Sequence, residues 1–205
     1  MSVIAREFYD RSALEVARDL LGCRLVRQLD GVRMAGLILE TEAYQGEEDL
    51  GCHAAAGRTP RTAIMYGSPG YAYVYFSYGL HWLLNAVADH KGTPAAVLIR
   101  AIQPIAGTDL MTINRPHLAL KRGWTDGPAK LTQALGITGD FNGVDLCDPS
   151  SGLWIEYGQA IQDGDVEQTP RVGLNAVPEP WKSIPWRFVL DTEGARLHEE
   201  GSIAS

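Results

Sequence analysis

Two extended segments joined by an Asp-Gly pair constrain the fold of this chain more than any other feature of its sequence. Residues 23–28 (CRLVRQ) and residues 32–44 (VRMAGLILETEAY) flank Asp30 and Gly31. Asp-Gly is a preferred pair in tight β-turns, so the two segments are predicted to form an antiparallel hairpin. A second pair of extended segments, YAYVYFSYG and HWLLNAVA, is predicted to turn near residues 77–80.

The remaining elements are predicted to be helices mixed with strands. The helices cover residues 10–21, with Asp10 as the cap and Gly22 as the stop, then residues 108–113, then residues 127–138, with Pro128 in the first turn and Gly136 as the stop. The strands cover residues 94–105, 153–157 and 186–191. This order lacks the alternation of βαβ units, and it therefore predicts an α+β fold on a mainly antiparallel sheet.

Composition indicates one globular domain, expected over residues 1–205. With 45% hydrophobic residues the chain can build one core. No apolar run approaches the roughly 20 residues of a spanning helix, and the first residues lack a secretory pattern, so we expect an intracellular protein without a membrane partner. Cys23, Cys52 and Cys147 form no CxxC pair, which predicts reduced thiols and neither disulfides nor a zinc site.

The net charge of −7 argues, taken alone, against nucleic acid as a partner. Binding of phosphates requires clustered Lys and Arg. Local clusters are present, however, at Arg58 and Arg61 and at Lys121 and Arg122. Net charge therefore leaves the question of nucleic acid open.

Residues 45–61 form a predicted loop that is longer than a compact domain normally carries without a function. Its histidine, His53, has three interpretations: a metal ligand with Glu48 or Asp49, an imidazole that contacts a base, or a surface residue. The other histidines are scattered along the chain, so a metal site is not expected.

The tyrosines of residues 71–79 are predicted to divide between a strand face and a hairpin tip. Side chains alternate along a strand, which places Tyr71, Tyr73 and Tyr75 on one face, Ala72, Val74 and Phe76 on a core-facing side, and Tyr78 at the tip. Aromatic rings stack on nucleobases for roughly 1–3 kcal/mol each, and wedge residues hold a duplex open. The alternative is that tyrosine simply favours half-buried strands.

Two carboxylates provide a candidate general base. Glu40 and Glu42 are two apart, hence on one strand face, and Tyr44 follows on the same face. Arg100 interrupts the apolar run AAVLIRAI, and a buried guanidinium needs an anion, for which Glu42 is a candidate. A nearby arginine would keep Glu42 ionised as a base.

Each of these residues also has a structural interpretation. Glu42 is also consistent with an exposed acid at the end of a strand. Arg100 is also consistent with a residue at a sheet edge whose guanidinium lies in water. Paired carboxylates also occur in glycosidases, but there they flank the substrate, and two acids on one side do not.

Several motifs in one order together resemble a known family. They are ETEAY (residues 40–44), the loop with His53, GRTPR (residues 57–61), YAYVYFSYG, Asn85 seven residues after Tyr78, LIRA (residues 98–101) and GPAKLTQALGI (residues 127–137). In this combination, from about residue 20 to beyond residue 188, the chain resembles the alkyladenine (3-methyladenine) DNA glycosylases, monofunctional base-excision enzymes.

The resemblance implies a single domain with a curved antiparallel sheet, surrounding helices and a β-hairpin that protrudes into the DNA minor groove. It implies base flipping and hydrolytic excision of alkylated or deaminated purines, which leaves an abasic site. The implied partner is double-stranded DNA with a damaged purine, and no metal or organic cofactor is implied. We expect a monomer, located in the cytoplasm with the nucleoid if the chain is bacterial.

The resemblance also implies a role for each matching residue. Glu42 resembles the general base, Arg100 the residue that positions the water with it, and Val172 the residue whose backbone carbonyl completes the water site. Tyr44, His53 and Tyr75 resemble the walls around the extruded base, Asn85 the residue that excludes guanine, and Tyr78 the wedge.

Phosphate contacts are expected from Arg58, Arg61, Lys121 and Arg122. The family carries a more basic run after the histidine than AAAGRTPR, and Gly51 and Cys52 replace a small apolar pair, so we expect weaker nonspecific DNA binding here. The alternative function is a non-catalytic module that binds lesions or single strands by tyrosine stacking. Preference among 3-methyladenine, 7-methylguanine, hypoxanthine and ethenoadenine stays open.

Overall fold

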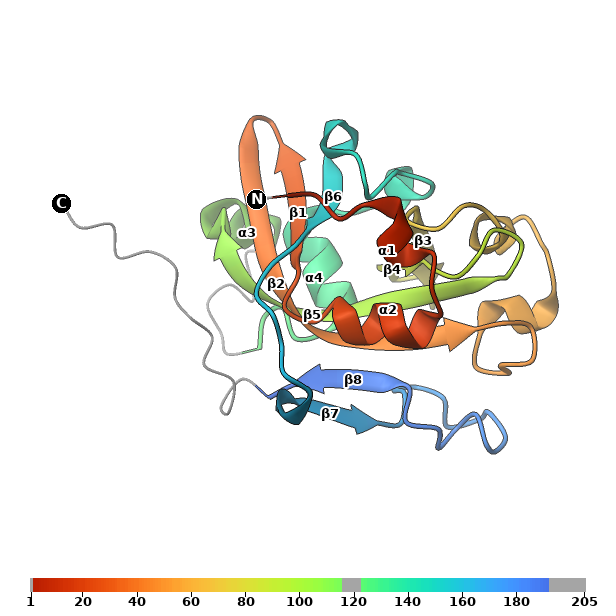
Figure 1. Ribbon diagram of the computed structural model, residues 1–205. Helices are drawn as coiled ribbons and strands as arrows, with labels where there is room; N and C mark the ends of the chain where they lie inside the picture. The colour runs from red at the N-terminus through yellow and green to blue at the C-terminus, as the bar shows by residue number, and fades with distance from the viewer. Residues whose placement is uncertain (1, 116–122, 192–205) are drawn as a thin grey trace.

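The computed structural model describes residues 2–115 and 123–191, which form one α+β domain (Figure 1). Its helices are α1 (Arg6–Tyr9), α2 (Ala13–Asp19), α3 (Thr108–Asn114) and α4 (Pro128–Leu135). Its strands are β1 (Arg24–Leu29), β2 (Val32–Gln45), β3 (Ala72–Ser77), β4 (His81–Val87), β5 (Ala95–Ala106), β6 (Leu153–Glu156), β7 (Val166–Thr169) and β8 (Arg187–Leu190). The predicted fold class is confirmed.

The strands form one open antiparallel sheet in which β2 is the central element. The order is β3-β4-β5-β2-β1-β6. β8 lies off this path and pairs with both β2 and β7. β5 pairs with β2 along most of its length. The opposite edge of β2 is shared, because β1 pairs with residues 32–37 and β8 pairs with residues 40–42.

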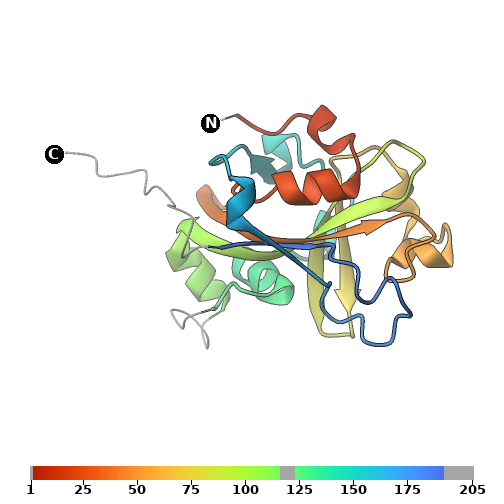
Figure 2. The ribbon, with the colours of Figure 1, turned by 60° about the horizontal axis from the view of Figure 1, so that its bottom comes forward.

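Helices cover both faces of the sheet. Figure 2 shows α2 on one side and α3 and α4 on the other. Alternation along β2 directs Thr41 toward α2, where its hydroxyl donates to the carbonyl of Ala17 at 2.7 Å. The next residue, Glu42, therefore points to the face that carries α4.

Most predicted elements are found, with several corrections, and the short helix α1 was not predicted. The helix predicted from Asp10 begins later, because Ser12 accepts the capping bond from the amide of Glu15, and the Asp10 carboxylate instead contacts His90. β7 was not predicted, since VEQT alternates weakly and is half exposed. The loop after β2 contains two short 3-10 helices, His53–Ala56 and Ala63–Tyr66.

The second hairpin, β3–β4, ends in the turn at residues 78–80. Ala72 and Val74 are buried as predicted, but Phe76 is 47% exposed. At that point the strand has passed the edge of the core, and the Phe76 ring packs against Trp82, with centroids 4.7 Å apart, and lines a cavity described below. The predicted core position of Phe76 is therefore wrong.

None of the helices in residues 2–115 and 123–191 is long and apolar enough to cross a membrane.

Candidate active site

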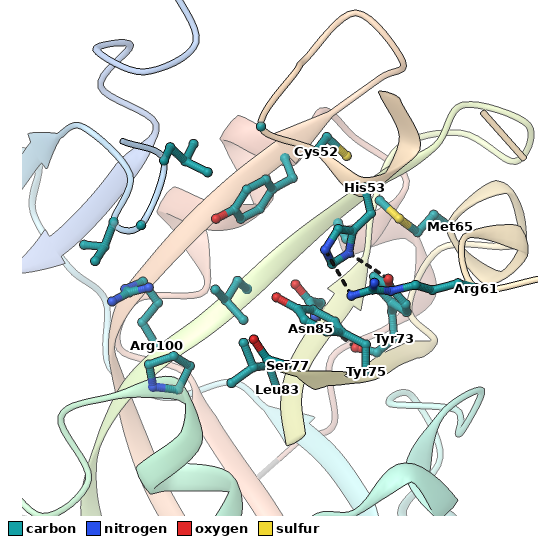
Figure 3. Close-up of a pocket in the computed structure, with 18 of the residues that line it drawn as sticks. Cys52, His53, Arg61, Met65, Tyr73, Tyr75, Ser77, Leu83, Asn85 and Arg100 are labelled. Carbon is teal, nitrogen blue, oxygen red and sulfur yellow. Dashed lines mark hydrogen bonds between the residues drawn. The ribbon is translucent and has the colours of Figure 1, made fainter. Parts of the chain in front are cut away.

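A cavity of about 460 Å³ lies where β2, β3, β4 and β5 meet the loop after β2. Its volume is in the range of sites that bind small molecules. Among its lining residues are eight site residues predicted from the sequence: Tyr44, His53, Arg61, Tyr75, Tyr78, Asn85, Arg100 and Val172. Figure 3 shows His53 and Arg61 on one side of the cavity and Arg100 on the other.

Glu42 lies directly behind the wall of this cavity and is fully buried. Its Oε1 accepts a hydrogen bond from the backbone N–H of Val172 at 2.6 Å, and its Oε2 accepts one from the Tyr44 hydroxyl at 2.7 Å. Arg100 Nη1 is 3.3 Å from Oε2. All three partners line the cavity, so Glu42 reaches it through them.

The charge state of Glu42 results from opposing effects. Burial raises the pKa of this carboxyl, whereas Arg100, the amide of Val172 and the hydroxyl of Tyr44 lower it. The net direction is upward. A buried carboxylate with a raised pKa is a stronger proton acceptor than a surface one, as a general base requires.

Irregular pairing between β2 and β5 shapes this end of the sheet. The register shifts on both sides of Glu40, and such bulges re-aim side chains near functional sites. Glu40 and Glu42 still share a face, as predicted, because both contact Arg100. The shorter contact is to Glu40, where Arg100 Nε donates to Oε1 at 2.6 Å.

His53 opens the first 3-10 helix and is held between two side chains of the cavity. Its Nε2 is 3.2 Å from Arg61 Nη2, and its Nδ1 is 2.8 Å from the Tyr73 hydroxyl (Figure 3). Arginine can only donate, so Nε2 is the acceptor and Nδ1 carries the proton. Burial and the charge of Arg61 lower the pKa of His53 to about 4, which keeps the imidazole neutral at physiological pH.

Aromatic rings form the wall next to His53. The rings of His53 and Tyr75 meet edge to face with centroids 4.6 Å apart, and the Tyr73 ring lies 5.4 Å from that of Tyr75. Asn85 is buried on the paired strand, and its side-chain amide donates to the carbonyl of Tyr73 at 3.0 Å. This bond fixes the Asn85 side chain where it lines the cavity.

Tyr78 stands at the rim, with 92% of its surface exposed. Its φ of +50° and that of Gly79, +67°, place the pair in the left-handed region, as in a type I′ hairpin turn. The turn is closed by the amide of Leu80, which donates to the carbonyl of Ser77 at 3.0 Å. The predicted tip position of Tyr78 is confirmed.

The basic residues predicted to contact phosphate are placed differently from one another. Arg58 is exposed, with its guanidinium 5.8 Å from the centroid of the Tyr66 ring. Arg61 instead lines the cavity, 4.9 Å from the centroid of the Tyr75 ring. Lys121 and Arg122 lie outside the described residues.

A buried ion pair beneath the cavity was missed by the sequence analysis. Arg171 donates to both carboxylate oxygens of Asp49, at 2.5 and 2.7 Å, and to the carbonyl of Ala43 at 3.0 Å. Its guanidinium lies 4.6 Å from the centroid of the Tyr44 ring. In the sequence, the pair is indicated only by an arginine directly before Val172. Its partner, Asp49, is 122 residues away and is brought next to it by the fold.

The described residues hold no group of three or more His, Cys, Asp and Glu side chains that could bind a metal ion. Asp49, considered above as a ligand together with His53, has both oxygens bound by Arg171.

Comparison with known proteins gives a consistent result. Residues 7–194 match the family model described as methylpurine-DNA glycosylase (MPG). A provisionally named 3-methyladenine DNA glycosylase of Methanocella arvoryzae is 48% identical over 92% of each chain. Proteins with the same provisional name are 44% identical in Carboxydothermus hydrogenoformans, over 92% of this chain and 95% of the relative, and 43% identical in Myxococcus xanthus, over 94% and 93%.

Proposed function

The chain belongs to the methylpurine-DNA glycosylase family and is a DNA glycosylase for alkylated bases; on that premise we propose that it flips alkylated and deaminated purines out of duplex DNA and excises them by hydrolysis, as a monomer. The observation that carries the proposal is Glu42, a fully buried carboxylate directly behind an aromatic cavity. Chemistry on a base requires that the base leave the stack, and damaged bases leave it at lower cost.

The cavity suits a flipped purine. We assign the walls to Tyr44, His53 and Tyr75, which present aromatic faces and edges to a planar ring. Asn85 is assigned to exclusion of guanine, since its amide is fixed on the cavity wall where an exocyclic amine would meet it. In the duplex, Tyr78 would fill the space that the base vacates, because its ring is almost fully exposed at the hairpin tip.

Bond cleavage is assigned to Glu42 with Arg100. Glu42 accepts a proton from water, the water oxygen forms a bond to the sugar C1′, and the bond from C1′ to the base nitrogen breaks. The electron pair of that bond stays with the departing base. We assign Arg100 to orientation of the water, and the backbone carbonyl of Val172 to completion of the water site; the amide of the same residue binds Glu42 Oε1.

Damaged bases differ in how much catalytic assistance they need from the protein in order to leave the sugar. A cationic methylated purine becomes neutral as it takes the electron pair, so it is a good leaving group, and aromatic walls attract its charge. Hypoxanthine is neutral and must gain a proton as it leaves. We therefore expect excision of hypoxanthine to depend more strongly on the protein side chains.

Release of bases from defined duplexes tests this function. Duplex oligonucleotides with hypoxanthine, ethenoadenine or an alkylated purine are incubated with the protein, and alkaline cleavage then reveals abasic sites. We expect product from at least one lesion. Absence of product from every lesion would refute the enzymatic function and favour a binding module.

The variant Glu42→Gln tests the role of the carboxylate. It keeps the size of the side chain but cannot accept the proton, so we expect lesion binding to persist while turnover falls by roughly 10²–10⁴-fold. Retained turnover would remove Glu42 as the base. Glu167→Gln on exposed β7 is the control for the same chemical change.

We further propose that the protein cleaves no DNA strand. None of the described residues that line the cavity is a lysine, the usual amine for a Schiff base. Borohydride should therefore trap no covalent complex with lesion DNA, and a trapped complex would contradict a purely hydrolytic mechanism.

A further inference from the structure

One oxygen of Glu40 accepts hydrogen bonds from two arginines. Arg100 Nε and Arg187 Nε each lie 2.6 Å from Oε1 of Glu40. Arg187 stands on β8 directly opposite Glu42, and its Nη1 donates to the hydroxyl of Thr169 on β7 at 3.0 Å. Glu40 thus connects β5 and β8 through two charged contacts in a part of the site that retains little exposure, 12% for the Glu40 side chain.

Arg100 is shared unequally between the two carboxylates. Its distance to Glu40 is 2.6 Å, whereas its distance to Glu42 is 3.3 Å. Short charge-assisted hydrogen bonds are the stronger ones, so Glu40 determines where the Arg100 side chain lies. The longer contact still pairs Arg100 with Glu42, whose pKa it lowers, but without the short hydrogen bond that Arg100 makes to Glu40.

Resting on the proposed role of Glu42 as the base, we propose that Glu40 is a positioning residue that keeps Arg100 from approaching Glu42 more closely than the 3.3 Å contact. Without the Glu40 charge, the Arg100 guanidinium could turn to Glu42 and pair with it closely. That pair would add a second close donor to Oε2, which already accepts from the Tyr44 hydroxyl, and would make the carboxylate a weaker acceptor for the proton of water. Glu40 thereby keeps Glu42 basic.

Other groups near Glu42 do not take over this function. Those that face it are Tyr75 from β3, Arg100 from β5, Arg187 from β8, the Val172 amide after β7, and Glu40 and Tyr44 from β2. Among them Glu40 is the one anion, and it raises the pKa of Glu42. Removing the charge of Glu40 should therefore lower the pKa of Glu42, whereas removing the charge of Arg187 should raise it.

Titration of the Glu42 carboxyl measures this effect without catalysis. Protein with ¹³C-labelled glutamate carboxyls is titrated by NMR, and the Glu42 signal is assigned by its loss in Glu42→Gln. In Glu40→Gln the midpoint of Glu42 should move to lower pH, because an anion is lost and Arg100 turns to Glu42. In Arg187→Met it should move to higher pH, because a cation is lost.

Glu167→Gln removes an exposed carboxylate on β7 and should leave the midpoint of Glu42 unchanged. An unchanged midpoint in Glu40→Gln, or equal shifts in Glu40→Gln and Glu167→Gln, would overturn the proposal. Denaturant unfolding checks that the variants are folded, and Arg187→Met supplies the opposite sign if Glu40→Gln proves unstable.

Kinetics then separate this proposal from the function it rests on. In Glu40→Gln the acid limb of the pH profile of kcat should follow the NMR midpoint, and kcat at neutral pH should fall on the order of tenfold with little change in KM. If the NMR midpoint moves and the acid limb of kcat does not, Glu40 positions Arg100 but Glu42 is not the base.

Discussion

At the scale of residues, the two oxygens of the buried Glu42 carboxylate have different partners. Oε1 of Glu42 is bound by the amide of Val172, which a side-chain substitution cannot remove. Oε2 is bound by the Tyr44 hydroxyl and approached by Arg100. Tyr44 therefore combines two functions: its ring forms a wall, and its hydroxyl holds the proposed base.

Tyr44→Phe separates these functions. The ring is kept, but Glu42 loses a donor that lowers its pKa, so that pKa should rise. A base with a higher pKa is protonated at higher pH, and the acid limb of the kcat/KM profile should move to higher pH. The measurement is the pH profile of base excision under single-turnover conditions.

Tyr66→Phe is the matched control for Tyr44→Phe. The Tyr66 hydroxyl also donates to a carboxylate, that of Glu47 at 2.5 Å, but Tyr66 does not line the cavity. An acid limb that stays in place in Tyr44→Phe, or moves equally in both variants, would show that the hydroxyl of Tyr44 does not set the basicity of Glu42.

Local periodicity explains which single residues could be predicted. The spacing of two between Glu42 and Tyr44 identified their shared face, and the Tyr78-Gly79 pair identified the tip. The alternation of side chains along the strand predicted Phe76 to be in the core. That prediction was wrong, because alternation does not show where a strand extends beyond the core. Arg171 and Arg187 are distant in sequence from Asp49 and Glu40, so no local pattern connects them.

The β3–β4 hairpin shows, at the scale of elements, a conflict between local stability and the proposed function. A type I′ turn favours Asn-Gly, since asparagine tolerates a positive φ. This turn instead carries a bulky tyrosine at φ +50°, at a cost of roughly 1–2 kcal/mol for a left-handed residue. A tyrosine at this unfavourable position is consistent with the proposed role of Tyr78 as a wedge, which requires its ring at the tip of the hairpin.

Tyr78→Asn should therefore have opposite effects on stability and on binding. We expect the free energy of unfolding to rise by about 1 kcal/mol, because the turn then suits its conformation. Affinity for a lesion duplex should fall, with much less effect on a single strand of the same sequence. Denaturant unfolding and binding titrations measure the two effects, and equal losses on duplex and single strand would contradict the wedge.

At the scale of the whole molecule, two parts of the chain that are distant in sequence, residues 43–49 and residues 171–181, meet at Arg171. Its guanidinium binds Asp49 in the loop of His53, the carbonyl of Ala43 on β2 and the carbonyl of Trp181, and the next residue is Val172. The Arg171 and Asp49 side chains are both fully buried. The pair therefore fixes two parts of the site relative to the sheet.

Asp49→Asn should destabilise the protein strongly. It leaves the guanidinium of Arg171 buried without its anion, which costs about 3–5 kcal/mol of unfolding free energy. Excision should fall even where the variant remains folded, since the loop that carries His53 loses its anchor. Asp126→Asn, in the exposed pair with Lys130, is the control and should cost at most about 1 kcal/mol.

The shared edge of β2 has a consequence for the order in which the enzyme forms during synthesis. β1 is made immediately before β2, but β8, which completes the same edge beside Glu40 and Glu42, follows more than 140 residues later. Until β8 emerges from the ribosome, that part of β2 presents an unpaired edge, the kind of surface on which chains aggregate. Arg171, Val172 and Arg187 arrive in the same late stretch. Most of the sheet can thus be made while the proposed base still lacks the amide that holds it, and the proposed site is complete only after residues 171–187 have been synthesised.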